Sequence, residues 1–208
     1  MRVPTPRRLS PRSLLVAVFL AAAVALSPAR LDAAVLTWNA TLSGAQEIPA
    51  NVSTATGSGT VQYDTVANTL AIDVDWSGLT GDGIQAHIHC CVVTPPGNVG
   101  IALDLWLLSD PSRPPTGTYS AFYDLDVDNP FRATFVTANG GTTASAFAAL
   151  MAAMDAGDGR AYFNIHTVEF PGGEIRGNIA VPEPASLWLL VGGLGAAMLR
   201  RRSSRGRT

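Results

Sequence analysis

The sequence contains no lysine in its 208 residues, so all fourteen of its basic side chains are arginines. Five of these arginines lie within residues 1–34 and five within residues 182–208. Between Val35 and Val181 four arginines remain against fourteen acidic residues, which gives this central part a formal net charge of −10. A surface of that sign repels phosphate backbones and anionic headgroups and attracts cations. The composition therefore excludes nucleic acid as a partner.

Motifs that carry common catalytic chemistry are also missing. The sequence has no nucleophile elbow, phosphate-binding loop, Cys-x-x-Cys pair or His-Glu-x-x-His helix. Serine, histidine and aspartate are all present, but no sequence pattern brings a serine to a histidine. We therefore predict that the protein is not an enzyme.

The N-terminal 34 residues have the form of a secretory signal peptide. An apolar run, Leu14–Leu26, is followed by small residues with candidate cleavage sites near Ala29 and Ala34. Four arginines precede the run, namely Arg2, Arg7, Arg8 and Arg12. This order predicts that residues 1–34 direct export and are then removed. The alternative is an N-terminal membrane helix that is retained.

The C-terminal segment, residues 182–208, combines a short motif, an apolar run and a basic cluster. Pro182, Glu183 and Pro184 precede the run Ala185–Leu199, and Arg200, Arg201 and Arg202 follow it. As a helix the run would span about 22 Å, which is short for a permanent anchor in a hydrocarbon core of about 30 Å. Arginines resist crossing the bilayer, so this end should stay in the cytoplasm. The alternative is an ordinary single-pass anchor.

This arrangement resembles the PEP-CTERM sorting signal of Gram-negative bacteria. The resemblance implies transient membrane insertion as a transmembrane helix, recognition by an exosortase-type protease and removal of the tail. It also implies delivery of the protein to the cell surface or to an exopolysaccharide-rich extracellular matrix. Pro182, Glu183, Pro184 and the three arginines Arg200, Arg201 and Arg202 are the residues that would carry the signal.

The central part, residues 35–181, alternates apolar and polar residues in short runs separated by glycine, proline, asparagine and aspartate. In the run 69–76 the large apolar side chains share one parity and Asp73 and Asp75 take the other, which is typical of a half-buried strand. The pattern predicts an all-β fold, a Greek-key, immunoglobulin-like β-sandwich. The candidate strands are 35–42, 59–64, 69–76, 85–93, 100–107, 117–126, 161–168 and 174–181.

One segment, 143–156, departs from the strand pattern. It is rich in alanine, and Phe147, Leu150, Met151 and Met154 recur at the spacing of one helix face. Thr142 or Thr143 can cap its start, and Gly157 or Gly159 can end it in a left-handed turn. We predict one short amphipathic helix that covers the core. A methionine-rich binding groove is the alternative.

The three histidines of the chain are candidate metal ligands. His87 and His89 lie two residues apart on a predicted strand and therefore face the same side, away from the core-facing Ile88. His166 lies on a second predicted strand with the same relation to Ile165. If the strands are neighbours, the three imidazoles converge into a set that suits zinc or copper, with water, Glu169 or Glu174 as a fourth ligand. The alternative is that the histidines only hold loops through hydrogen bonds.

The only two cysteines, Cys90 and Cys91, are adjacent. In an oxidising compartment an even count favours a disulfide, although neighbouring Cα atoms, about 3.8 Å apart across a trans peptide, lie below the usual disulfide range. Three states are open: a strained bridge between the two residues, a buried Cys90 with Cys91 as a metal ligand, and two free thiols.

Three segments of the central part resemble the CHRD (chordin-type) domain, a family widespread among bacterial exported proteins. They are Leu42–Pro49 with the following 55–59, the run Ala86–His89, and Tyr162–Thr167 with Pro171–Gly177. The resemblance spans about residues 36–180 and implies a β-sandwich-like fold in an extracellular setting. We expect a non-enzymatic surface or matrix module that binds a polysaccharide or another surface protein. The alternative is a metal-binding or redox protein that uses His87, His89, His166 and possibly Cys91.

Overall fold

The computed structural model describes residues 35–107 and 109–182. Its strands are β1 (Val35–Ser43), β2 (Thr56–Asp64), β3 (Thr69–Ser77), β4 (Gly83–His89), β5 (Ile101–Trp106), β6 (Gly117–Asp124), β7 (Tyr162–Thr167) and β8 (Ile175–Asn178). Its helices are the 3₁₀ turn η1 (Gly44–Gln46), α2 (Ala133–Ala138) and α3 (Thr143–Ala156). All eight candidate strands are present, so the predicted all-β class is confirmed.

The alternation of residue types explains how the strands pack. On β3 the side chains of Leu70, Ile72 and Val74 are buried, while those of Asp73 and Asp75 are exposed. A strand turns successive side chains to opposite faces, so one face of β3 enters the core and the other meets water. The same core contains apolar residues from β1, β2, β4, β5, β7 and β8.

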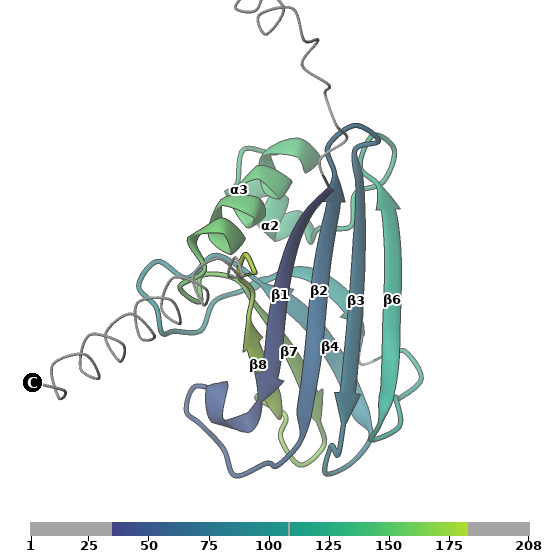
Figure 1. The fold of residues 1–208 in the computed structure, drawn as a ribbon, viewed down its shortest axis with the longest axis vertical. Coiled ribbons are helices and arrows are strands. Elements are labelled where there is room, and N and C mark those ends of the chain that lie inside the picture. The colour runs from purple at the N-terminus through teal and green to yellow at the C-terminus, as the bar shows by residue number, and fades with distance from the viewer. Residues whose placement is uncertain (1–34, 108, 183–208) are drawn as a thin grey trace, which may run out of the picture. The chain divides into compact units, whose positions relative to one another are not determined.

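The eight strands form a single antiparallel sheet in the order β5-β4-β7-β8-β1-β2-β3-β6. Strand β1 pairs with β2 along its whole length, and it joins β8 through Ser43 opposite Arg176. Asn39 of β1 also forms an isolated bridge with Ala180, which follows β8. Figure 1 shows β1, β2, β3 and β6 in front of β4, β7 and β8. The two separate sheets of a Greek-key sandwich are not confirmed, because the narrow β1–β8 pairing makes the sheet continuous.

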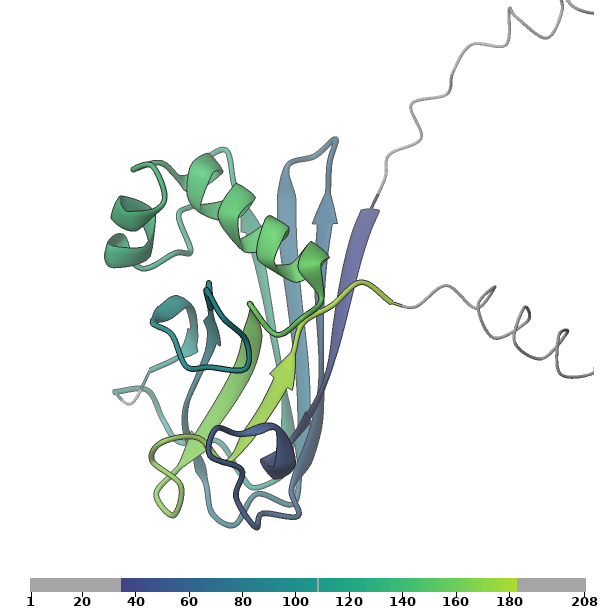
Figure 2. The same cartoon turned by 90° about the vertical axis from the view of Figure 1, so that its left-hand side faces the viewer.

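Helix α3 covers one end of the core, and its bounds are those predicted from the sequence (Figure 2). Thr142 caps its start in a reciprocal capping box with Ser145, and Gly157 ends it in the left-handed conformation at φ 64°. The ring of Phe147 packs against that of Tyr63 on β2 at 4.5 Å between centroids. Within the described residues, no helix is both long enough and apolar enough to span a bilayer.

The predicted terminal signals fall almost entirely outside the described residues. This is true of the signal peptide at 1–34 and of Glu183, Pro184, Arg200, Arg201 and Arg202. Pro182 is described, and it is exposed at the end of the chain segment that follows β8.

Candidate metal centre

The three histidines come together on neighbouring strands. Strands β4 and β7 pair antiparallel, with His87 opposite Asn164 and His89 opposite Tyr162, and this register places His166 beside the β4 pair. One ring nitrogen from each of His87, His89 and His166 lies within 4.8 Å of the other two. The ring centroids of His87 and His166 are 5.1 Å apart, and those of His87 and His89 are 5.5 Å apart. The expected convergence of the histidines is therefore present.

This histidine face of the sheet is buried, although it points away from the hydrophobic core. Ile88 and Ile165 occupy the core side of β4 and β7, as predicted from their parity. His87 is only 1% exposed and His166 only 7%. Chain segments that lie outside the strands reach the rings, because main-chain oxygens of Val99 and Pro171 contact them.

Those two contacts fix which ring nitrogen carries the proton. Nδ1 of His89 lies 2.8 Å from the Val99 carbonyl oxygen, and Nδ1 of His166 lies 3.0 Å from that of Pro171. A carbonyl oxygen can only accept, so each Nδ1 bears the hydrogen and each Nε2 presents a lone pair when the ring is neutral. Metal-bound histidines are commonly held in this way, with the distal N–H donated to a main-chain carbonyl.

The nitrogens that face the cluster have no hydrogen-bond partner. Nε2 of His89, Nε2 of His166 and both ring nitrogens of His87 are buried and unpaired. The predicted alternative, in which the histidines only hold loops, explains the Nδ1 contacts of His89 and His166. It does not explain the unpaired nitrogen that each of the three rings can offer to an ion, which costs about 1–3 kcal/mol per ring if nothing binds it.

The surroundings keep the imidazoles neutral. Burial, with further contributions from the nearby His166 and His89, lowers the pKa of His87 to about 3. Burial also lowers the pKa of His89 to about 4 and that of His166 below its ordinary value. A neutral imidazole is the form that coordinates a metal ion, so the cluster offers lone pairs at neutral pH.

A carboxylate adjoins the cluster but is already paired. Asp104 on β5 has Oδ1 at 3.6 Å from Nε2 of His87. Arg132 donates to both of its oxygens, from Nε at 2.8 Å and Nη2 at 2.7 Å. Sequence reasoning missed this pair, although Asp104 is the one acid within a strand that pairs with β4.

The two acids expected as a fourth ligand serve elsewhere. Glu174 is buried and accepts hydrogen bonds from Ser53, Thr80 and Thr167. Glu169 is exposed and lies beside Gly81. Within the described residues, the candidate metal-ligand group contains the three histidines and no carboxylate.

An aromatic stack connects His89 to a buried arginine. The rings of His89 and Tyr162 are parallel to within 5° at 4.8 Å between centroids. Cζ of Arg176 lies 3.4 Å from the centroid of the Tyr162 ring. The strand order β4-β7-β8 places His89 and Arg176 on opposite sides of Tyr162. The sequence indicated one part of this stack: Tyr162 and His166 lie four residues apart on one strand, so Tyr162 faces the same side as the histidines.

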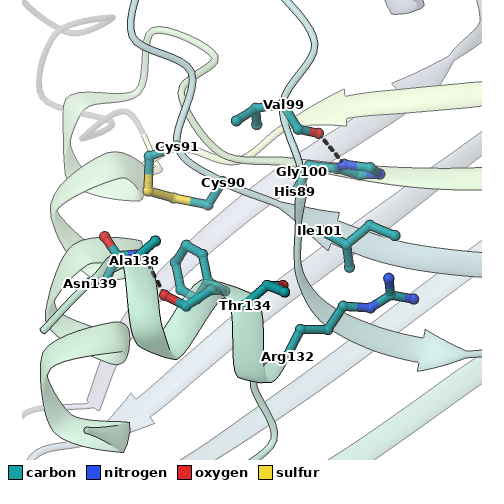
Figure 3. Close-up of a pocket in the computed structure, with 11 residues that line it drawn as sticks. His89, Cys90, Cys91, Val99, Gly100, Ile101, Arg132, Thr134, Ala138 and Asn139 are labelled. Atoms are coloured by element: carbon teal, nitrogen blue, oxygen red, sulfur yellow. Dashed lines mark hydrogen bonds between the residues drawn. A yellow bond between two sulfur atoms is a disulfide. The ribbon is translucent and has the colours of Figure 1, made fainter. Parts of the chain in front are cut away.

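Cys90 and Cys91 form a disulfide with each other. Of the three open states, the structure therefore contains the bridge, and neither sulfur is a free thiolate that could bind a metal. The predicted strand 85–93 ends early, at His89, because a strand turns consecutive side chains to opposite faces and cannot join them. The disulfide lines a cleft of about 740 Å³ together with His89 and Arg132. Figure 3 shows how these residues lie.

Comparison with known proteins identifies the family and nothing more specific. The model of the CHRD domain matches residues 38–179, which contain all three histidines and every strand except the first three residues of β1. No curated protein and no solved structure matches the chain. The match covers more than half of the sequence, and the chain therefore belongs to the CHRD domain family.

Proposed function

We propose that this protein binds one transition-metal ion, copper or zinc, through His87, His89 and His166, and that it catalyses no reaction. The observation that carries the proposal is the convergence of three buried ring nitrogens within 4.8 Å. Nitrogen donors from three imidazoles are a ligand set that both metals accept. Two of the rings are oriented by carbonyl oxygens, which reduces the freedom that metal binding would otherwise have to remove.

The test is the metal content of the protein purified from cells that express the full chain. We expect about one equivalent of copper or zinc per chain, and its loss in His87→Ala. Gln62→Ala, an exposed change on β2, is the matched control and should keep the metal. A metal-free protein that also fails to take up Cu⁺, Cu²⁺ or Zn²⁺ from solution would contradict the proposal.

We further propose that the chain is exported and sorted to the cell surface or extracellular matrix of a Gram-negative bacterium. Residues 1–34 would direct export, and Pro182, Glu183 and Pro184 with the arginines 200–202 would direct an exosortase-type protease. The Cys90–Cys91 disulfide supports this setting, because disulfides persist in oxidising compartments. At the surface, the domain would contact a polysaccharide or another surface protein.

Replacement of Pro182, Glu183 and Pro184 by alanines tests the sorting proposal. The variant should accumulate in the membrane as an unprocessed precursor, whereas the parent chain should be cleaved and recovered in the surface or matrix fraction. Equal processing and equal location of the two proteins would refute the role of the motif. Extraction of the matrix polysaccharide should then release the parent protein if that polysaccharide is its partner.

A further inference from the structure

The histidine cluster provides no negative charge to a bound ion. Its three donors are neutral imidazoles, and the sulfur atoms of Cys90 and Cys91 are bonded to each other. The nearest carboxylate, that of Asp104, is matched by the guanidinium of Arg132. An ion at the centre would therefore keep nearly all of its formal charge.

The donor nitrogens of the cluster are also shielded from solvent. The unpaired nitrogens of His87, His89 and His166 have almost no solvent-accessible surface. Zinc sites with three histidines usually complete a tetrahedron with a water or hydroxide at an open position. Here solvent hardly reaches the donor atoms, although His89 also lines the cleft beside the disulfide, so a hydroxide that would offset part of the charge of a divalent ion has no exposed position at the cluster.

A further positive charge lies close by. Arg176 is 1% exposed, and its guanidinium stacks on the Tyr162 ring that in turn stacks on His89. Its hydrogen bonds go to neutral groups, Asn98 Oδ1 and the Gly97 carbonyl oxygen, and none of the ion pairs within the described residues includes it. The charge of Arg176, one aromatic ring away from His89, disfavours a metal cation at the cluster, and a divalent cation twice as strongly.

From these three observations we infer that the centre selects a monovalent ion, Cu⁺, over Zn²⁺ and Cu²⁺. The inference rests on the proposed metal-binding function and specifies which charge the bound ion has. Transfer of an ion from water into a closed, weakly polar site costs free energy in proportion to the square of its charge, so the cost for a divalent ion is about four times larger. Cu⁺ also accepts three ligands, whereas zinc in proteins almost always has four.

The experiment compares affinities on the metal-free protein. Cu⁺ is titrated without oxygen against a chromophoric Cu⁺ chelator, and Zn²⁺ and Cu²⁺ are titrated separately against their own competitors. We expect Cu⁺ to bind at least about a hundredfold more tightly than either divalent ion. Tighter or equal binding of Zn²⁺ or Cu²⁺ would overturn the inference and leave the metal-binding function intact. If none of the three ions binds, the proposed function fails as well.

A pair of arginine variants tests the electrostatic cause. Arg132 and Arg160 are each paired with one aspartate and are exposed to similar extents, 40% and 41%. Arg132→Gln leaves the charge of Asp104 unmatched beside His87 and should raise the affinity for Zn²⁺ relative to Cu⁺ by about tenfold. Arg160→Gln, whose partner is Asp158, should leave the ratio unchanged. Equal ratios in the parent and in Arg132→Gln would contradict the role assigned to charge.

Discussion

Thr167 and Glu174 are joined by a 2.6 Å hydrogen bond, from Oγ1 to Oε2, across the loop that separates β7 from β8. The other carboxylate oxygen of Glu174 accepts from Ser53 Oγ at 2.7 Å and from the backbone N and Oγ1 of Thr80 at 2.8 and 2.9 Å. One buried side chain therefore ties together three loops at the same end of the sheet. One of these loops contains Pro171, whose carbonyl oxygen orients His166.

Replacement of Glu174 by glutamine should lower the free energy of unfolding by about 2–3 kcal/mol at pH 7. The reason is that an amide offers one acceptor oxygen in place of two, and its NH₂ group would face donors. Burial alone would raise the pKa of Glu174, but the hydrogen bonds from Thr167, Ser53 and Thr80 outweigh it and lower that pKa. The stabilisation should therefore be present above pH 4.5 and fade as the pH falls further.

Chemical denaturation of the parent and of Glu174→Gln, followed over pH 3–8, measures this difference. Glu169→Gln is the matched control, because Glu169 is an exposed acid in the same loop. A loss of stability in Glu174→Gln no larger than that in the control would show that the buried bonds do not hold the loops.

The neighbouring glycines Gly172 and Gly173 should respond differently to alanine. Gly173 has φ 126°, and a Cβ there would overlap Nδ2 of Asn164 and approach Oε1 of Glu47 to 2.6 Å. At Gly172 a Cβ would meet nothing within 4 Å. We expect Gly173→Ala to destabilise the protein by about 2–4 kcal/mol, and Gly172→Ala to have an effect below about 1 kcal/mol. Thermal unfolding of the two variants measures their loss of stability. A larger loss in Gly172→Ala than in Gly173→Ala would contradict the prediction.

Glu47 should make the protein less stable as the pH rises. Burial raises its pKa to about 7, although the charge of Arg176 and the hydrogen bond from Asn164 act in the opposite direction. A carboxyl group with a folded pKa above its unfolded value of 4.5 stabilises the fold fully below pH 4.5. That contribution is lost as the pH rises from 4.5 through 7.

Glu47→Gln removes this titration and keeps an oxygen that can accept from Asn164. The variant should therefore be more stable than the parent by about 2 kcal/mol at pH 8, with little difference at pH 4. Urea denaturation at the two pH values provides the comparison. A stability difference that is the same at both values would contradict the raised pKa.

The elements that the sequence predicts well are those specified by local patterns. The parity of Leu70, Ile72 and Asp73 indicates both the β3 strand and its buried face. Helix α3 has an apolar stripe, a threonine cap and a terminal glycine, and its bounds agree with the prediction. Helix α2, Ala133–Ala138, was missed because six residues cannot display a helical stripe and four of them are β-branched or aromatic.

The parts that were not predicted depend on contacts between distant residues. The sheet is continuous because Ser43 pairs with Arg176, and no local pattern encodes that pairing. Strand parity predicts that His87 and His89 share a face, but it does not predict that loops bury this face. The Arg132–Asp104 pair and the stack of Arg176 on Tyr162 likewise join elements far apart in the chain. These contacts set the charge around the candidate metal centre.

Substitution of His87 best distinguishes a role in protein stability from a role in metal binding. Both of its ring nitrogens are buried and without a hydrogen-bond partner. In the metal-free protein the free energy of removing them from water is therefore not offset by hydrogen bonds. His87→Leu should raise the stability of the metal-free protein by about 1 kcal/mol, because it replaces two unpaired polar atoms with apolar ones of similar size. In the parent, a metal at one hundred times its dissociation constant should add about 2.7 kcal/mol, and this gain should vanish in the variant.

Thermal unfolding with and without metal tests both predictions, the higher stability of the metal-free variant and the loss of the metal-induced gain. The control is His166→Leu, which should also abolish the metal-induced gain but should destabilise the metal-free protein, because it removes the bond to the Pro171 carbonyl oxygen. If His87→Leu destabilises the metal-free protein as much as His166→Leu does, then His87 serves the fold through packing. If the variant keeps the metal-induced gain, His87 is not a ligand. The combination of a more stable metal-free protein and a lost response is the result expected of a ligand at His87, because such a side chain destabilises the fold without the ion and contributes only when the ion is bound.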